Sequence, residues 1–293
     1  MRSKGTVWSV MLIASVVSIW MTGCTQKHDT DVEFVPTPQQ VVIEMLKMAG
    51  VTKNDVVYDL GCGDGRIVIT AAKMFGARGV GVDIDPFYIT LSNKRARKEG
   101  VTDRVKFIEG DFFQTKLNDA TVVALYLTPE LNQRLRPIFF RELKPGSRIV
   151  SHDFNMGDWK PDNIGRLHNI KHEYPDRTYN RDAPFYYWVI PANAAGTWRG
   201  TMPPSADRRY TLRLIQKYQK ISGMVTLRGR EQPVTDARLV GDHLSFTFHD
   251  NVDGEQIVMW FYGRISGNVI QGNLEVQGGS SAGNYNWTAK RDR

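Results

Sequence analysis

Residues 55–66 read Asp-Val-Val-Tyr-Asp-Leu-Gly-Cys-Gly-Asp-Gly-Arg, and this stretch decides the fold. A short apolar run with β propensity ends at Asp59, and three alternating glycines, Gly61, Gly63 and Gly65, then lead into a helix-like stretch. A strand, a glycine turn and a helix N-terminus together allow backbone N–H groups to approach a ligand closely. The stretch therefore predicts a ligand-binding βα unit, although tight turns also use glycine for conformational reasons alone.

The charges around this turn indicate which ligand it favours. A dinucleotide places a pyrophosphate over such a turn, usually at the spacing G-x-G-x-x-G. Here the spacing is G-x-G-x-G, and the carboxylates of Asp59 and Asp64 lie beside it in the sequence. Two carboxylates would repel a pyrophosphate. They suit a ligand that carries an ammonium group, such as the methionine end of S-adenosylmethionine (SAM).

Two further stretches end in acids at the positions that such a ligand requires. Residues 79–83 predict the next strand, and Asp83 at its end is placed to accept hydrogen bonds from both ribose hydroxyls. Residues 105–109 predict another strand, and Asp111 just after it is placed to accept a hydrogen bond from an adenine amino group. The acids therefore predict a SAM site along one edge of a sheet.

With these motifs in this order, the chain resembles the class I (seven-strand) SAM-dependent methyltransferases over residues 34–192. A narrower resemblance is to the small protein-lysine methyltransferases, whose relatives act on mitochondrial membrane proteins. It rests on residues 35–38, 57–66 and 125–131, the last of which read Leu-Tyr-Leu-Thr-Pro-Glu-Leu. The resemblance implies SAM as the cofactor and a protein lysine as the methyl acceptor. The cofactor-binding residues that it implies are Thr37, Asp59, Gly61, Gly63, Asp64, Asp83, Ile84, Asp111 and Phe112.

The chemistry of methyl transfer singles out few other residues. The sulfonium of SAM makes its methyl carbon electrophilic, so the protein mainly aligns the acceptor and excludes water. Tyr126 follows the fourth expected strand and would line a desolvated acceptor pocket, with ordinary strand packing as the alternative. Glu130 would orient an amine, or simply favour the start of its helix. His152 and Asp153 end the fifth expected strand and would line the rim of the site.

The order of elements predicts two domains. Alternating strands and helices predict an α/β domain at 34–192, with a doubly wound, Rossmann-like parallel sheet that binds its ligand at the carboxyl ends of the strands. An antiparallel pair would close this sheet, and residues 191–196 read as a linker. A small antiparallel, barrel-like all-β domain is expected at 197–293, with Trp198 and Trp287 in its core or, alternatively, at a ligand mouth. Its expected strands are 210–218, 223–228, 237–240, 243–249, 257–265, 269–276 and 285–290.

The N-terminus predicts export to a membrane. A basic start precedes the apolar stretch 7–20, and residues 21–24, Met-Thr-Gly-Cys, resemble a bacterial lipobox whose cysteine is lipidated. We therefore expect a signal peptide with its lipobox at 1–24, lipid on Cys24, a polar tether at 25–33, and an exported, membrane-anchored protein. An uncleaved signal anchor and a cytoplasmic location are the alternatives.

Composition argues against several other classes of protein. The formal net charge is +7, but the lysines and arginines are dispersed and no basic run carries interleaved aromatic residues, so we expect no nucleic-acid partner. Cys62 lies inside the glycine turn, where a structural role is expected, and no disulfide forms if Cys24 carries lipid. No histidine and cysteine spacing predicts a metal site. No Asn-Pro-Pro-Tyr motif follows the fourth strand, which argues against the enzymes that use it to methylate amino groups of DNA bases and glutamine.

Three functions remain open from the sequence. The first is a membrane-tethered SAM-dependent methyltransferase that acts on a protein lysine, and the second is a methyltransferase for a small molecule. The third is an exported binding protein that retains the SAM-type fold without turnover, because SAM is made in the cytoplasm and the signal predicts export. The intact acids Asp59, Asp83 and Asp111 favour true cofactor binding.

Overall fold

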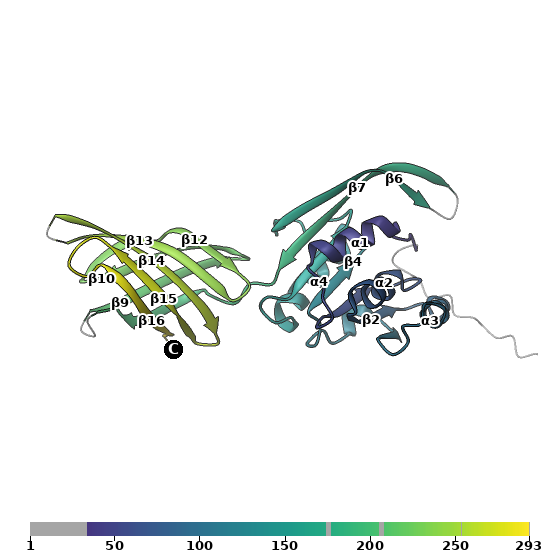
Figure 1. The fold of residues 1–293 in the computed structure, drawn as a ribbon, viewed down its shortest axis with the longest axis horizontal. Coiled ribbons are helices and arrows are strands. Elements are labelled where there is room, and N and C mark those ends of the chain that lie inside the picture. The colour runs from purple at the N-terminus through teal and green to yellow at the C-terminus, as the bar shows by residue number, and fades with distance from the viewer. Residues whose placement is uncertain (1–33, 174–176, 205–207, 253, 293) are drawn as a thin grey trace, which may run out of the picture.

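The computed structural model describes residues 34–173, 177–204, 208–252 and 254–292, which form two β-sheets (Figure 1). The predicted signal peptide, the lipidated Cys24 and the tether lie outside the described residues. Within the described ranges, no helix is both long and apolar enough to cross a membrane.

The first sheet has seven strands, whose order is β3-β2-β1-β4-β5-β7-β6. Strands β1 to β5 are parallel, and β7 and β6 complete the sheet as antiparallel strands. This arrangement confirms the predicted Rossmann-like fold. The strands are β1 (Val56–Leu60), β2 (Arg78–Asp83), β3 (Val105–Glu109), β4 (Val122–Leu125), β5 (Arg148–His152), β6 (Asn163–Glu173) and β7 (Thr178–Val189).

Helices cover both faces of this sheet. The helices are α1 (Gln39–Met48), α2 (Arg66–Phe75), α3 (Pro86–Glu99) and α4 (Pro129–Glu142). Apolar residues of α1 and α2 pack on one face, and those of α4 pack on the other. All four residues of β4 are buried, as expected for a parallel strand with a helix layer on each side. Strand β1 lies between β2 and β4, so the strand order reverses there and the carboxyl ends of these strands open a crevice.

The second sheet has nine antiparallel strands in the order β11-β10-β9-β8-β16-β15-β14-β13-β12. Strands β10 and β12 lie against each other, so the sheet is nearly closed, which confirms the predicted barrel-like region. The strands are β8 (Gly196–Thr201), β9 (Arg209–Lys217), β10 (Lys220–Leu227), β11 (Arg230–Pro233), β12 (Thr235–Val240), β13 (His243–Val252), β14 (Glu255–Ser266), β15 (Val269–Gln277) and β16 (Gly283–Arg291).

Two of these strands, β8 and β11, were not predicted, and the linker assigned to 191–196 is wrong at its last residue. Strand β8 begins at Gly196 and pairs with both β9 and β16. Its residues, Gly-Thr-Trp-Arg-Gly-Thr, hold one large apolar side chain, and β11 reads Arg-Glu-Gln-Pro. Neither stretch has apolar alternation, so pairing with neighbouring strands, rather than local preference, makes them strands.

Aromatic side chains fill the interior of the second sheet. Phe246 and Phe261 stack with 4.6 Å between ring centroids, and Trp287 packs edge-on against Phe261 at 5.1 Å. Trp287 Nε1 donates to the carbonyl of Tyr262 over 3.0 Å, and the fully buried Trp198 similarly donates to its own local backbone. Both tryptophans are therefore core residues with their indole N–H groups satisfied.

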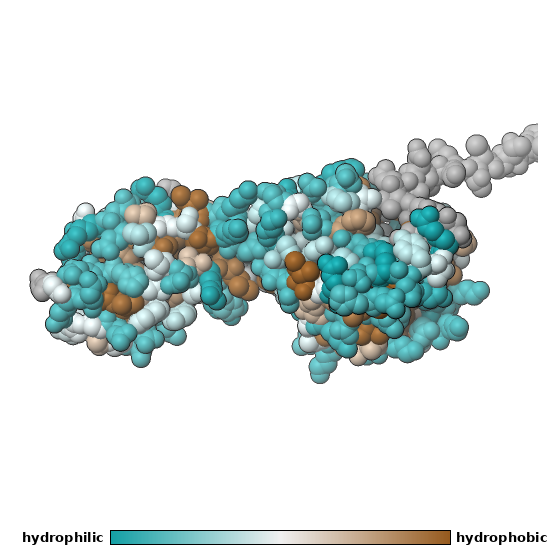
Figure 2. All heavy atoms as spheres, turned by 90° about the horizontal axis from the view of Figure 1, so that it is seen from above, coloured by the Kyte–Doolittle hydropathy of each residue, from teal (hydrophilic) through white to brown (hydrophobic). Residues whose placement is uncertain are grey.

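The two sheets meet at the turn between β9 and β10. The ring of Tyr218 stacks on Trp159 of the first region with 5.8 Å between centroids, and its hydroxyl donates to Asp158 over 3.0 Å. Gln219 accepts a hydrogen bond from Trp159 Nε1 at 2.9 Å and donates to the carbonyl of Lys160 at 2.8 Å. This turn therefore fixes the segment that follows β5. From above, the surface of both regions is mainly hydrophilic, with hydrophobic residues in small groups (Figure 2).

Candidate active site

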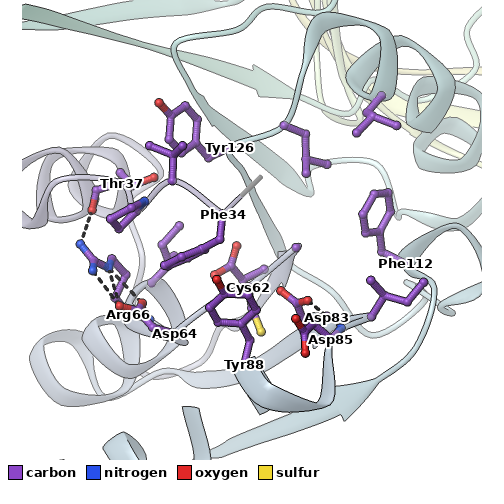
Figure 3. Close-up of a pocket in the computed structure, with 18 of the residues that line it drawn as sticks. Phe34, Thr37, Cys62, Asp64, Arg66, Asp83, Asp85, Tyr88, Phe112 and Tyr126 are labelled. Carbon is purple, nitrogen blue, oxygen red and sulfur yellow. Dashed lines mark hydrogen bonds and ion pairs between the residues drawn. The ribbon is translucent and has the colours of Figure 1, made fainter. Parts of the chain in front are cut away.

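A cavity of about 420 Å³ lies at the carboxyl ends of β1 to β4, beside the point where the strand order reverses (Figure 3). This size is typical of a site for a small organic ligand. Gly63 and Glu130 are not part of the wall. The sequence-predicted residues that line the cavity are Thr37, Asp59, Gly61, Asp64, Asp83, Ile84, Asp111, Phe112 and Tyr126.

The three glycines of the turn adopt left-handed backbone conformations, with φ of +77° at Gly61, +50° at Gly63 and +75° at Gly65. A Cβ atom at Gly63 would lie 1.9 Å from the ring of Phe34, and one at Gly65 would lie 2.7 Å from the ring of Phe107. The turn therefore needs glycine both for its conformation and for the close approach of these rings. It ends where α2 begins, so the helix N-terminus points at the cavity.

Asp83 connects the glycine turn to the next βα unit. Its Oδ2 accepts a hydrogen bond from the Gly63 N–H at 2.7 Å, and its Oδ1 accepts from the Asp85 N–H at 3.0 Å. Each carboxylate oxygen can accept more than one hydrogen bond, so both oxygens can still receive ligand hydroxyls. Burial raises the pKa of Asp83 above its ordinary value despite these two donors.

Asp59 and Asp64, which the sequence analysis treated alike, differ in the structure. Asp59 is 2% exposed, and burial together with the charges of Asp83 and Asp64 raises its pKa well above the ordinary value. Burial also opposes the ionisation of Asp64, but hydrogen bonds and charge from Arg66, with the charge of Arg95, hold its pKa below the ordinary value. A guanidinium nitrogen of Arg66 lies 2.7 Å from Asp64 Oδ2. Asp59 is thus the carboxylate that a cationic ligand would neutralise.

The opposite ends of the cavity differ in character. Figure 3 shows Phe112 on the same side as Asp83, and Thr37 and Tyr126 at the other end. Asp111 caps a short 3-10 helix, η1 (Phe112–Gln114), by accepting a hydrogen bond from the Phe113 N–H at 2.8 Å. This cap holds the Phe112 ring beside the cavity, where it can flank a flat heterocycle.

The N-terminal segment of the described chain closes one wall, and sequence reasoning missed most of it. The carbonyl of Thr37 accepts a hydrogen bond from Arg66 Nη1 at 2.9 Å. The ring of Phe34 lies 4.5 Å from that of Tyr88, which stands in the first turn of α3. The available signal for Phe34 was its position directly before the Val-Pro-Thr-Pro stretch, while Tyr88 carried no signal at all.

Tyr126 is anchored by residues of the following strands. Its hydroxyl donates to Asp153 Oδ2 over 3.0 Å, and Asp153 is paired with Arg181 of β7. The ring of His152 lies 4.1 Å from that of Tyr126, and burial lowers the pKa of His152 to about 3. His152 and Asp153 therefore lie behind Tyr126 rather than on an open rim. Arg181 was missed because nothing in its local sequence marks it.

Glu130 is exposed in the first turn of α4, where Thr128 caps the helix by accepting from the Leu131 N–H at 3.4 Å. Its own backbone N–H and Thr128 lower its pKa, as expected for an acid at a helix start. Cys62 is buried, and burial raises the pKa of its thiol, which suits a structural residue. The described residues contain no cluster of three or more metal-ligating side chains.

Comparisons with known proteins agree with this site. Residues 59–163 match the model of the ANTKMT methyltransferase domain family. A protein-lysine N-methyltransferase from Saccharolobus islandicus (strain REY15A) is 44% identical over 144 residues, which cover 48% of this chain and 89% of the archaeal protein. The adenine nucleotide translocase lysine N-methyltransferase of Mus musculus is 32% identical over 105 residues, covering 36% of this chain and 46% of the mouse protein.

Among solved structures, an RNA methyltransferase from Salinibacter ruber in complex with S-adenosyl-L-homocysteine is 45% identical, with a TM-score of 0.48. The match covers 59% of this chain and 99% of that one. On its own residues, the cavity described above suits SAM, because two carboxylates with raised pKa values, a glycine cradle and an aromatic wall suit a cationic nucleoside. Given this fit, and the archaeal relative that the chain covers almost completely, the chain belongs to the ANTKMT-type protein-lysine methyltransferase family and is a SAM-dependent methyltransferase.

Proposed function

We propose that this protein transfers the methyl group of SAM to the ε-amino group of a protein lysine at the Tyr126 end of the cavity. The observation that carries the proposal is the division of the cavity, with Asp83 and Phe112 along one part and Tyr126 at the far end. The class of acceptor is supported by the archaeal and mouse relatives, both of which are named lysine N-methyltransferases.

In this proposal the cofactor, when bound, supplies an electrophilic methyl carbon on a positively charged sulfur. Asp59 pairs with its ammonium group, and Asp83 accepts hydrogen bonds from the ribose hydroxyls. Asp111 accepts a hydrogen bond from the adenine amino group, while Ile84 and Phe112 flank the ring. The raised pKa values of Asp59 and Asp83 fit this assignment, because the ammonium group beside Asp59 and the hydroxyl donors to Asp83 both favour the ionised carboxylates.

The acceptor lysine must reach this site as a neutral amine, and its lost proton passes to water. The nitrogen lone pair then forms the new C–N bond while the C–S bond breaks and its electron pair stays on sulfur. The cavity wall also includes the apolar residues Val35, Pro36 and Leu127, and an apolar surrounding of this kind favours the uncharged amine by lowering its pKa. The ring of Tyr126 lines this end of the cavity and helps to exclude water from the amine.

Methyl transfer to protein lysine is tested with the full-length protein, SAM carrying a tritiated methyl group, and a protein extract from source cells that lack this protein. After acid hydrolysis, we expect the label in N-methylated lysines, and we expect Asp59→Asn to abolish it. Label confined to nucleic acid or to small molecules would overturn the lysine assignment. Calorimetric SAM binding without any transfer would instead identify a binding protein without turnover.

We further propose that the protein is exported and held at a membrane by lipid on Cys24. The support is the sequence alone, in which a basic start and the apolar stretch 7–20 precede a lipobox-like Met-Thr-Gly-Cys. Metabolic labelling with a palmitate analogue is expected to mark the wild type and not Cys24→Ser. Equal labelling of both proteins would rule out lipid on this residue. Export would also place the site away from the cytoplasmic source of SAM.

A further inference from the structure

A second cavity lies at the edge of the first sheet opposite the cavity of the candidate active site. Its volume is about 590 Å³, and its lining residues come from the amino ends of β1, β2 and β3 and from the segments that precede β4 and β5. The two cavities have no lining residue in common. Methyl transfer therefore leaves the second cavity unused, although its volume is sufficient for a small organic molecule.

The connection from β3 to β4 leaves this part of the sheet open. Helices α2 and α3 follow β1 and β2, but this connection forms only the short 3-10 helix η1. On the sheet face that packs against α4, Tyr58 is the register partner of Val80, and Val80 pairs in turn with Lys106 of the edge strand β3. Paired residues point to the same side of a sheet, so these three side chains form a row along the cavity.

Basic side chains surround the second cavity. Arg104 lies 3.7 Å from Asp103 and donates to the carbonyl of Gly76 at 2.9 Å. The other cations of the lining form no ion pair with any residue that the structure describes. Four cations and two acids leave an excess of two positive charges, which attracts anions. The cations are Arg78, Arg104, Lys106 and Lys144, and the acids are Asp103 and Asp119.

Tyr58 supplies a buried hydrogen-bond donor to the same cavity. It is 9% exposed, and its hydroxyl has no hydrogen-bond partner within the described ranges. The other hydroxyl of the lining, that of Thr121, already donates to Asp55 over 2.7 Å. Burial, together with the charge of Asp119, raises the pKa of Tyr58, so the phenol keeps its proton at neutral pH. The Tyr58 hydroxyl can therefore donate to an anion in the cavity.

The lining also limits the class of anion. The apolar side chains of Val56, Val80 and Val105 form part of it, so part of the ligand can be apolar. The excess of two positive charges matches a phosphate monoester, whose charge at neutral pH is about −1.5 to −2. Guanidinium and ammonium groups form strong, charge-assisted hydrogen bonds with phosphate oxygens. A nucleic acid would instead need basic side chains along an extended track.

We propose that the second cavity binds a small molecule that carries a phosphate monoester, with Arg78, Lys106 and Lys144 around the phosphate and the Tyr58 hydroxyl donating to it. The proposal goes beyond methyl transfer, because the cavity shares no residue with the candidate active site. The ligand should therefore bind together with SAM and should not compete with it.

Titration calorimetry of the full-length protein tests the proposal with phenyl phosphate as the probe. In low salt we expect a dissociation constant of about 1 mM or below. Benzenesulfonate, a singly charged analogue of similar size, should bind at least about fivefold more weakly because it carries less charge. Saturating SAM should leave the dissociation constant of phenyl phosphate unchanged within twofold. Undetectable binding of phenyl phosphate, or competition with SAM, would overturn the proposal.

Three substitutions place the probe in the second cavity. Lys106→Gln and Arg78→Gln should each weaken binding of phenyl phosphate about fivefold, because each removes a charge beside the phosphate. Tyr58→Phe keeps the ring and removes only the hydroxyl, and should weaken binding about tenfold. The matched control is Lys290→Gln, at an exposed lysine of β16, which should leave binding unchanged. Wild-type affinity in Tyr58→Phe would show that the probe binds elsewhere.

Two further measurements complete the test. The SAM dissociation constant of each variant should stay within twofold of the wild type, which separates loss of the second site from loss of folding. Vesicles that contain phosphatidic acid should not displace phenyl phosphate. Displacement by these vesicles would identify a lipid headgroup as the ligand and overturn the assignment to a free small molecule.

Discussion

The two sheets of this protein arrange their strand ends in opposite ways. In the first, β1 to β4 are parallel, so their carboxyl ends collect at one edge, where Asp59, Asp83, Asp111 and Tyr126 border a single cavity. In the second sheet the strands are antiparallel, so their ends alternate between two edges and the interior is filled by stacked rings such as that of Phe261. The comparison teaches that strand direction, more than composition, decides where polar side chains can converge on a ligand.

The largest effect should come from emptying the core of the second sheet. Phe261 is 1% exposed, and Phe261→Ala should lower the free energy of unfolding of this region by about 3–5 kcal/mol. Denaturant unfolding followed by tryptophan fluorescence measures the loss. The SAM dissociation constant, measured by calorimetry under native conditions, should stay within twofold. The control is Tyr262→Ala, at a neighbouring residue that is 50% exposed. A marked loss of SAM affinity in Phe261→Ala would contradict the separation of packing from binding.

The next largest effect should come from the first sheet. Asp83→Ala removes the proposed ribose acceptor and the partner of the Gly63 N–H, and should weaken SAM binding about 100-fold, which is about 2.7 kcal/mol. Titration calorimetry measures it directly. Glu275→Ala, at an exposed acid of β15, is the matched change in the second sheet and should have no effect. Unchanged affinity in Asp83→Ala would refute the placement of the ribose.

The smallest effect should appear where the two sheets touch. Gln219→Ala leaves the buried Trp159 indole N–H without its acceptor, which should cost about 1–3 kcal/mol in the free energy of unfolding. Because Gln219 joins the regions, calorimetric unfolding should separate into two transitions or broaden. Gln277→Ala, at an exposed glutamine of β15, is the control. A sharp wild-type-like transition in Gln219→Ala would show that this contact does not couple the two sheets.

Local sequence predicted the features that local patterns determine. The alternation of strands and helices, the glycine turn and the acids after successive strands all follow from short-range rules, and the first sheet matches them. The anchor of Tyr126 does not follow from such rules, because Arg181 reaches Asp153 across the β5–β7 pairing. The difference between Asp59 and Asp64 was also hidden, since it depends on how the guanidinium groups of Arg66 and Arg95 pack against Asp64.

The contact between Phe34 and Gly63 has a consequence for where the enzyme can work. Because the ring of Phe34 lies against the glycine turn, the described chain begins on the wall of the cavity itself. If Cys24 is held in a lipid surface, the backbone from there to Phe34 reaches at most ~36 Å when fully extended. The N-terminal segment would then limit the distance between the membrane surface and the cavity. Only acceptors embedded in that membrane, or resting close to it, would come within reach of methyl transfer.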